Sequence, residues 1–501
     1  MAKWNKEQLR NESPADRVAA TGKTISFTWM LGGLLKSTVV NATGPIIIGI
    51  PELKKYMREH GVRGMAGPVM LKASNDVLWG KTSTVEKRLM EEAVHKGVAT
   101  DHYIQSIFDA LRGKFGERFS HAMRLLAWPF SKVEVHNRLT SLVAMFRVAY
   151  PVELKKAKSA GLIGKEAEEA AYQETFNVGR IFNNNVNYYY GKPNRPLVIQ
   201  SGDLIGVVGS AIYTFKAFPQ NLLARQAELL SQGDFRTFAH TMAYMALFGG
   251  LMGLPFFKDF FEWFEKEFGY SPIQSIRKTL RGVGGKTLET LGISGLPAVL
   301  GANISGSINI GLPWPIGADN PADSVFGVMG ALVKRGINTT QALGRGDWER
   351  AATEISPEFI RSPLTALKES EIGKSLGYQG FATNPRGNVM YGESGKPITL
   401  STKEAIIKMG GFNPTEHAHE KEMNATIMRQ KSWVAEQKTN IAETFKIARL
   451  QKKPSAMKDM MNDVRELNQK IRNRGLQTLG GLTSVSKIIQ ASRQVKGKKE
   501  R

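Results

Sequence analysis

The chain has 501 residues, of which 42% are hydrophobic, so it can bury a large core and is not disordered as a whole. Its formal net charge of +23 favours a polyanionic partner, either nucleic acid or the acidic face of a membrane. The sequence contains no cysteine, which excludes disulfides, a thiolate nucleophile and cysteine-bound metal.

The first half of the chain contains two apolar zones that charged residues interrupt. The zone at 24–51 includes Lys36, and the zone at 197–219 includes Asp203 and Lys216, so neither is a clean membrane span. The polar residues before the first zone predict no cleavable signal peptide. Together with a third apolar zone further on, this pattern favours conditional contact with a membrane over a resident membrane protein.

Between residues 51 and 182 apolar residues recur at helical spacing. The predicted helices cover 51–61, 85–97, 100–116, 132–149 and 153–182. The fourth of these carries Glu134, His136 and Arg138. Such a set suits acid–base chemistry, with Glu134 as the candidate catalytic carboxylate, but side chains spaced in this way also bond to neighbouring helices.

The stretch at 240–268 looks least like part of an ordinary soluble enzyme. It has no charged side chain from 242 to 257, and after that aromatic and charged residues mix. The uncharged part is shorter than the ~20 residues that cross a bilayer as a helix, and glycines and Pro255 weaken it. Two interpretations stay open, a buried central helix and a membrane-inserting hairpin or re-entrant segment. The candidate membrane contacts are Met242, Tyr244, Leu247, Phe248, Leu251, Phe256, Phe257 and Trp263.

Glycine and proline crowd the chain from 282 to 346, which predicts an irregular, turn-rich region with short helices. Helices are predicted at 324–335 and 348–355. Further on, residues 389–391 and 398–400 are predicted to pair as a small ribbon, which is the only hairpin-like signal in the sequence.

Two more helices are predicted after the ribbon. Ser401 or Thr402 caps the first, which ends at Gly410. Asn413, followed by a proline, caps the second, which extends from 414 to about 450.

The chain ends in a basic arm that begins at Arg465 and contains only Glu466 and Glu500 as acidic residues. A segment of one charge sign is either a solvated tail or an arm that contacts phosphates, and both interpretations stay open. The candidate nucleic-acid contacts are Arg465, Lys470, Arg472, Arg474, Lys487, Arg493, Lys496, Lys498 and Lys499.

Two sequence patterns suggest a phosphate-binding loop and a metal site, but each lacks the residues or the spacing that such a site requires. The tripeptide GKT occurs twice, without the earlier glycine and the preceding strand of a phosphate-binding loop. Glu416, His417, His419 and Glu420 lie together, but histidines two residues apart on a helix point to different faces. The sequence therefore predicts no metal site, no cofactor and no enzymatic activity.

The predicted fold class is mainly α, an elongated multi-helix protein with at most a small β-ribbon. Composition divides the chain into four regions. They are N-terminal helices at 1–130, central helices with apolar segments at 131–281, a Gly/Pro-rich irregular region at 282–400, and C-terminal helices with a basic tail at 401–501.

Several short stretches of the chain resemble the PLxRFG-type region at the C-terminal end of very large polyvalent phage proteins. Together they span most of the chain, and their order is more specific than any one of them. They are LLKSTVVNATGPIIIGIPEL (34–53), VEVHNRLTSLVAMFRVA (133–149), NYYYGKPNRPLV (187–198), YTFKAFPQNLL (213–223), GLMGLPFFKD (250–259), GLPAVLGANISGSINIG (295–311) and KEAIIKMGGFNP (403–414).

This resemblance implies a mostly helical, non-enzymatic protein of the virion interior, which leaves the capsid with the DNA or ahead of it. In the large relatives the enzymatic modules lie upstream of this region. The implied role is to help form a conduit across the host envelope, with further copies of the chain, other core and portal proteins, phage DNA and the envelope membrane as partners. The alternatives are a DNA-organising head protein without a membrane role, and an enzyme that acts on peptidoglycan.

Overall fold

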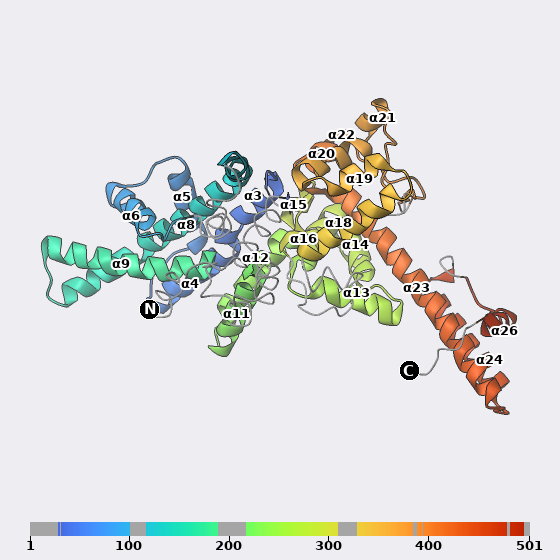
Figure 1. The fold of residues 1–501 in the computed structure, drawn as a ribbon. Helices are drawn as coiled ribbons and strands as arrows, with labels where there is room; N and C mark the ends of the chain where they lie inside the picture. Colours follow the sequence, from blue (N-terminus) through green and yellow to red (C-terminus); the bar gives the residue numbers. More distant parts are fainter. Residues whose placement is uncertain are drawn as a thin grey trace, which may run out of the picture.

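The chain is described by a computed structural model at residues 29–30, 32–100, 117–188, 217–308, 328–383, 388–392, 394–477 and 481–494. In these residues the fold is mainly α, which confirms the predicted class. The molecule is elongated (Figure 1). Helices from α3 (Leu35–Ala42) to α9 (Gly164–Asn187) gather at one end, and α24 (Ala456–Asn473) and α26 (Val485–Gln494) lie at the other.

The N-terminal helices surround the main hydrophobic core. They are α3, η1 (Pro45–Gly49), α4 (Ile50–Glu59), α5 (Ala66–Leu78), α6 (Thr84–His95), α8 (Glu117–Ser159) and α9. Apolar residues at helical spacing, such as Leu53, Met70 and Leu142, meet in this core and are almost completely buried. Burial of these helix faces is what stabilises them, since isolated helices are marginal in water.

Helix α8 is longer than the sequence predicts, because it continues through Pro129 and Pro151 and covers the predicted helix at 132–149 in its middle. The predicted boundary between residues 130 and 131 therefore lies inside a helix. Packing against α5 and α9 outweighs the local effect of the two prolines.

The central helices connect the two ends of the molecule. They are α11 (Ala217–Ser231), α12 (Phe235–Gly249), η5 (Leu251–Gly253), α13 (Phe257–Phe268), α14 (Pro272–Ser294), α15 (Leu296–Val299) and α16 (Ser305–Ile308). The predicted boundary at 281 and 282 lies inside α14, which kinks at Gly284 and Gly285. Met245 of α12 and Ile304 extend the main core into this part.

The predicted irregular region is mostly helical where the structure describes it, and this corrects the prediction. It contains the second half of α14 and the helices α18 (Val328–Leu343), α19 (Trp348–Ile355), α20 (Glu358–Lys368) and α21 (Glu371–Ser375). Helix α19 has the predicted bounds, because Asp347 accepts a hydrogen bond from the Arg350 amide and caps its start. The prediction relied on the glycine content. Several of these glycines lie at the ends of helices and do not prevent helices from forming.

The predicted ribbon at 389–391 and 398–400 forms only as local backbone pairing. Tyr391 and Pro397 make an isolated antiparallel bridge, and the Ile398 amide donates to the carbonyl of Met390. The one sheet in the described ranges pairs β1 (Ala302–Asn303) with β2 (Asn413–Pro414) instead. Asn413 thus belongs to a strand, and its side chain does not cap the helix that follows.

Three C-terminal helices, α23 (Thr415–Leu450), α24 and α26, form a unit with small hydrophobic cores of its own. Helix α22 (Thr402–Met409), which precedes this unit, begins at Ser401, one of the two predicted caps, and Ser401 forms a capping box with Glu404. Helix α23 has the predicted extent. The second half of α23 packs against α24 and α26. We call residues 431–494 the basic unit, and α23 leads from the rest of the molecule to it (Figure 1).

Candidate functional site

The apolar stretch at 242–257 is not one continuous helix. Helix α12 ends at Gly249, a short turn of η5 follows, and α13 begins at Phe257 in a new direction. Two residues with positive φ, Gly250 and Phe256, make the two corners. None of the helices in the described ranges is both long and apolar enough to span a membrane.

The candidate membrane contacts separate into two groups. Met242, Tyr244, Phe248 and Phe256 pack against the main core, and Leu251 packs against the cluster of Ile273 and Ile293. Three other candidates lie toward solvent, since Leu247 and Phe257 are exposed and Trp263 is partly exposed. The structure therefore places most of the stretch in the manner of a buried central helix, and leaves an aromatic surface on α13.

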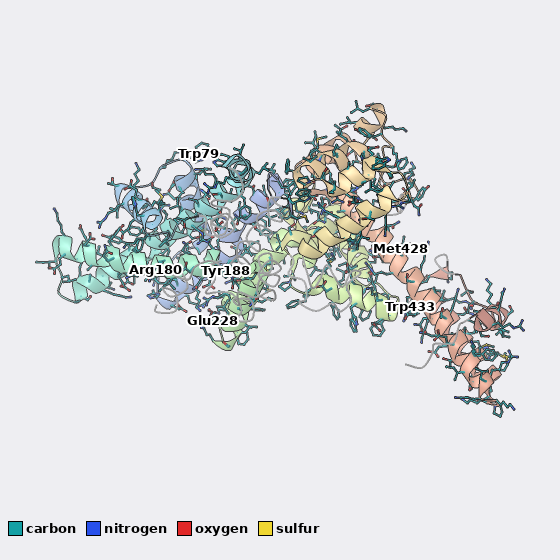
Figure 2. All side chains as sticks on the ribbon, in the orientation of Figure 1. Trp79, Arg180, Tyr188, Glu228, Met428 and Trp433 are labelled. Carbon is teal, nitrogen blue, oxygen red and sulfur yellow. The ribbon has the colours of Figure 1, made fainter. Side chains whose placement is uncertain are left out.

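The basic unit folds around an apolar stripe on α24. Met460, Val464, Leu467 and Ile471 recur at helical spacing and are buried against α23 and α26. Trp433 of α23, labelled in Figure 2, completes this packing. Its indole Nε1 donates to the backbone carbonyl of Glu267. The polar faces of the three helices therefore point outward, and they carry the charges.

These outward faces are strongly cationic, since residues 431–494 contain thirteen Lys and Arg side chains against five Asp and Glu side chains. Four of the candidate nucleic-acid contacts are exposed there, namely Arg465, Arg472, Lys487 and Arg493. Lys470 is exposed as well and lies 2.5 Å from Glu466, a solvent-screened pair that contributes little. Lys496, Lys498 and Lys499 lie outside the described residues.

Arg474, another candidate nucleic-acid contact, is partly exposed, and its guanidinium already has partners within the fold. Its guanidinium lies over the ring of Trp433, 4.7 Å from the centroid, and donates to the backbone carbonyl of Phe268. Arg474 therefore fastens the end of α24 to the end of α13.

Sequence reasoning missed the cations that α23 adds to this surface. Lys438 donates from Nζ to the backbone carbonyl of Gly481 at 3.2 Å. Burial, and then the charge of Lys487, lower the pKa of Lys438. Because two ammonium groups repel each other here, an anion at this position would relieve the repulsion. The positive charge of α23 was visible in the sequence, but its proximity to Lys487 depends on the fold.

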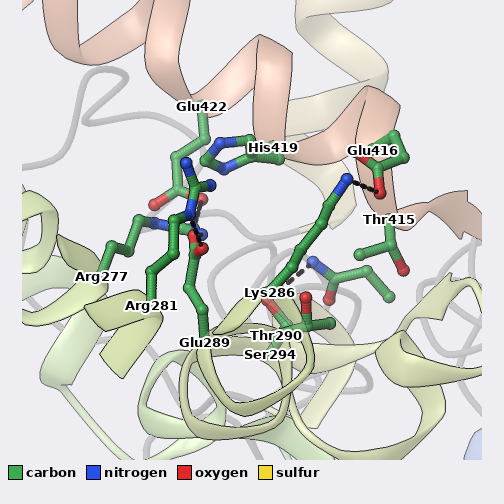
Figure 3. Close-up of a pocket in the computed structure, with 11 residues that line it drawn as sticks. Arg277, Arg281, Lys286, Glu289, Thr290, Ser294, Thr415, Glu416, His419 and Glu422 are labelled. Atoms are coloured by element: carbon green, nitrogen blue, oxygen red, sulfur yellow. Dashed lines mark hydrogen bonds and ion pairs between the residues drawn. The ribbon is translucent and has the colours of Figure 1, made fainter. Parts of the chain in front are cut away.

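A charged seam joins α14 to the first half of α23 (Figure 3). Arg277 lies between two carboxylates, with Nη1 3.2 Å from Glu289 and Nη2 2.7 Å from Glu422. Arg281 also reaches Glu289, with Nε at 2.6 Å. Burial would raise the pKa of Glu289, but its hydrogen bonds to the two arginines outweigh this and lower it.

The seam encloses a cavity of about 20 Å³ beside an open cleft of about 350 Å³. Lys286 and Glu416 line both, and their charged groups lie 2.7 Å apart. A cavity of this size holds about one water molecule. Since cations and carboxylates alternate around it, we interpret the seam as a join between helices and not as a site for a polyanion.

The histidines and glutamates at 416–420 do not form one cluster in the structure. Nε2 of His417 lies 3.0 Å from Oε2 of Glu369, whereas His419 lines the charged seam beside Arg277 and Glu422. The two imidazoles therefore face different neighbours, as their spacing predicts. Across the described ranges, no three residues of the types His, Cys, Asp and Glu are arranged to hold a metal ion.

Glu369 is a buried carboxylate at the end of α20, and Nζ of Lys421 lies 3.4 Å from it. Burial would raise its pKa, but the bond to His417 and the charge of Lys421 outweigh this and lower the pKa to about 2. Burial lowers the pKa of His417, so its imidazole is neutral at pH 7. This cluster holds the start of α23 against α20.

We expect the cluster to weaken in acid. A carboxylate whose pKa is depressed by folding stabilises the protein above its unfolded pKa, and the contribution is lost as pH falls from about 4.5 to about 2. Folding also lowers the pKa of His417. This lowering destabilises the folded protein below about pH 6.5, where the imidazole of the unfolded chain becomes protonated. Glu369→Gln should therefore cost up to about 3 kcal/mol at pH 7 and progressively less toward pH 3.

Thermal unfolding of both forms at pH 7, 5 and 3 measures this difference. Glu371→Gln, at an exposed carboxylate in the next helix, is the control. A cost of Glu369→Gln that stays constant from pH 7 to pH 3 would contradict the prediction.

Glu134, the candidate catalytic carboxylate, is buried within the N-terminal helices α3 to α9, which we call the N-terminal body. Its Oε1 accepts from Arg138 Nη2 at 3.1 Å, and Arg138 is completely buried. Arg138 also donates to the backbone carbonyls of Asn187 and Tyr188, at the end of α9. The pair thus joins α8 to α9, which is the interhelical bonding that the spacing allowed. His136 bonds to Ser74 of α5 in the same way, at 3.0 Å.

The sequence matches no protein-family model, and no curated protein or solved structure is similar to it. What supports a function is therefore the chemistry of these surfaces, namely the basic unit and the exposed aromatic residues of α13.

Proposed function

We propose that this chain is a non-enzymatic internal protein of a phage virion, which leaves the capsid with the DNA and helps to form a conduit across the host cell envelope. The observation that carries the proposal is the basic unit, whose positive side chains lie on the outside of a folded helical structure. Such a surface suits a partner with closely spaced phosphates and does not need a sequence-specific contact. Packed or passing phage DNA is a partner of this kind.

The proposed partners are further copies of the chain, other core and portal proteins, phage DNA and the host envelope membrane. The proposed location is the capsid interior and, after ejection, the cell envelope. The elongated shape and the predominance of helices are compatible with a component that packs beside its own copies (Figure 1).

Comparison of filled particles with particles emptied by triggered ejection tests this function. Quantitative mass spectrometry should find the chain in filled particles and its loss together with the DNA. Retention in the emptied shell would overturn the ejection role and favour the DNA-organising head protein, which also needs a basic surface. Absence from both the filled and the emptied particles would contradict a role in the virion and would favour the alternative of an enzyme that acts on peptidoglycan.

DNA binding by the basic unit has a measurable salt signature. Replacing Arg465, Lys487 and Arg493 by glutamine should weaken binding to duplex DNA and reduce the slope of log K against log salt by about 3, since each phosphate contact contributes about 0.9. Substitutions are preferable to truncation at Arg465, because truncation would also remove the buried Leu467 and Ile471.

The matched control replaces three exposed lysines of the N-terminal half, Lys72, Lys158 and Lys165, by glutamine. Both variants lower the net charge by the same amount. Equal losses of affinity in the two variants would show that only net charge matters and would contradict a site on the basic unit.

A further inference from the structure

Helix α13 carries an exposed row of aromatic side chains. Phe257 is 41% exposed, Phe260 is 50% exposed, and Phe268 at the end of the helix is 44% exposed. Trp263 and Phe264, between them, are partly exposed. The row continues past the helix to Tyr270, which is 40% exposed.

These rings contact one another, so they form one surface and not separate exposed residues. The ring centroids of Phe260 and Trp263 are 6.0 Å apart, and those of Phe264 and Phe268 are 4.5 Å apart. Phe264 also lies 6.3 Å from Tyr270. A contiguous apolar surface of this kind in a protein marks a place where it meets another apolar phase.

The opposite side of α13 fixes this surface in an outward position. Glu265 is buried, and its Oε2 accepts from Nε of Arg429 on α23 at 2.6 Å. Phe261 packs into the cluster of Ile273 and Ile293. Gly269, with φ of +62°, brings the chain against the ring of Trp433 where a Cβ atom would lie 2.4 Å from it. The aromatic row therefore cannot turn inward without breaking a buried ion pair.

The aromatic row adjoins the cationic end of α24. Arg474 donates to the carbonyl of Phe268, and Lys470 and Arg472 are exposed in the last turn of the same helix. Aromatic side chains favour the boundary between water and hydrocarbon, and lysine and arginine near that boundary bind acidic lipid headgroups. The two features together match the chemistry of an anionic bilayer surface.

We propose that the aromatic row of α13, residues 257–270, docks on the surface of an anionic lipid bilayer, with the adjoining end of α24 against its headgroups. The helix has 12 residues and is therefore about 18 Å long, so it lies in the plane of the interface and does not cross the bilayer. The inference rests on the proposed function only for the source of the lipid, which is the envelope of the host cell.

The aromatic row shares only Phe257 with the apolar stretch at 242–257. Most of that stretch packs against the main core. Binding at α13 needs no unfolding, because the aromatic row is already exposed. A second copy of the chain is the competing occupant, and the basic end of α24 argues against it, since two such ends would repel each other.

A single labelled cysteine tests the orientation directly, because the chain has no cysteine of its own. Phe260→Cys, labelled with a polarity-sensitive fluorophore, should brighten at least twofold and shift to shorter wavelength on vesicles that contain phosphatidylglycerol. Ile163→Cys, at an 80% exposed position beside α9, should not respond. A Phe260→Cys signal that rises with protein concentration and without vesicles would indicate a second copy and overturn the inference.

Flotation of the full chain with vesicles tests binding. The double substitution Phe260→Ser and Trp263→Ser should lower the bound fraction at least tenfold on phosphatidylglycerol vesicles, whereas Trp348→Ser, at a 72% exposed tryptophan on α19, should leave it unchanged. Circular dichroism confirms that each variant is folded. Unchanged flotation of the folded double variant would overturn the inference, while loss of the chain from emptied particles, scored independently of vesicles, would still support the proposed function.

Discussion

Gly250→Ala is expected to break the join between α12 and α14. Gly250 has φ of +62°, and a Cβ atom there would lie 2.1 Å from the carbonyl carbon of Ile293 and 2.3 Å from its oxygen. The clash is with the backbone at the end of α14, so no side-chain rotation relieves it. We expect a loss of free energy of unfolding above about 4 kcal/mol, seen as early melting and new protease cleavage between the two helices.

Gly233→Ala is the matched control for this prediction. Gly233 also has a left-handed backbone, with φ of +72°, but nothing lies within 4 Å of the position that its Cβ would take. It should therefore cost only the backbone strain, about 1–2 kcal/mol. Equal destabilisation by the two substitutions would show that the close approach of α12 and α14 is not what Gly250 provides.

Arg138→Met is expected to destabilise the N-terminal body by about 3–5 kcal/mol. The substitution removes the arginine that neutralises the buried Glu134 and leaves the carbonyls of Asn187 and Tyr188 without their buried donor. The first thermal transition should fall by roughly 6 °C or more. Adding Glu134→Gln to the same chain should recover part of the loss, because the buried carboxylate that Arg138 neutralises is then removed as well.

Arg88→Met provides the comparison with a pair on the surface. Arg88 and Glu169 make a two-pronged ion pair, at 2.7 and 2.8 Å, but both side chains are about half exposed. The thermal transition should change little, since exposed pairs are screened by water and salt. A similar shift for Arg88→Met and Arg138→Met would show that burial of the Arg138 pair does not matter.

The sequence predicted those elements whose signals are local. The bounds of α19 and α23 and the cap at Ser401 each depend on residues a few positions apart. Helix α8 was underestimated, because its two prolines are local signals that packing with other helices outweighs. The irregular region was predicted from glycine content, which records freedom of the backbone but not whether a helix ends or is prevented.

The candidate surfaces were predictable in kind and not in detail. The excess of positive charge near the C-terminus is visible in the sequence, but the partner of Arg474 is not, since Trp433 lies far away along the chain. Likewise the aromatic residues after Phe257 are visible, while the burial of Met245 and Phe248 beside them depends on helices from the N-terminal half. Contacts between distant segments carry no local pattern, so they appear only in the folded structure.

The two ends of the molecule differ in how their cores are connected along the chain. The basic unit takes its buried residues from 433 to 488, whereas the main core joins residues from 47 to 308. Forming contacts between distant segments requires the closure of long loops, which slows folding. After dilution from denaturant, pulse-labelling hydrogen exchange should therefore protect α24 before α9. A chain that is threaded through a narrow channel and must fold again on the far side would regain its basic unit first.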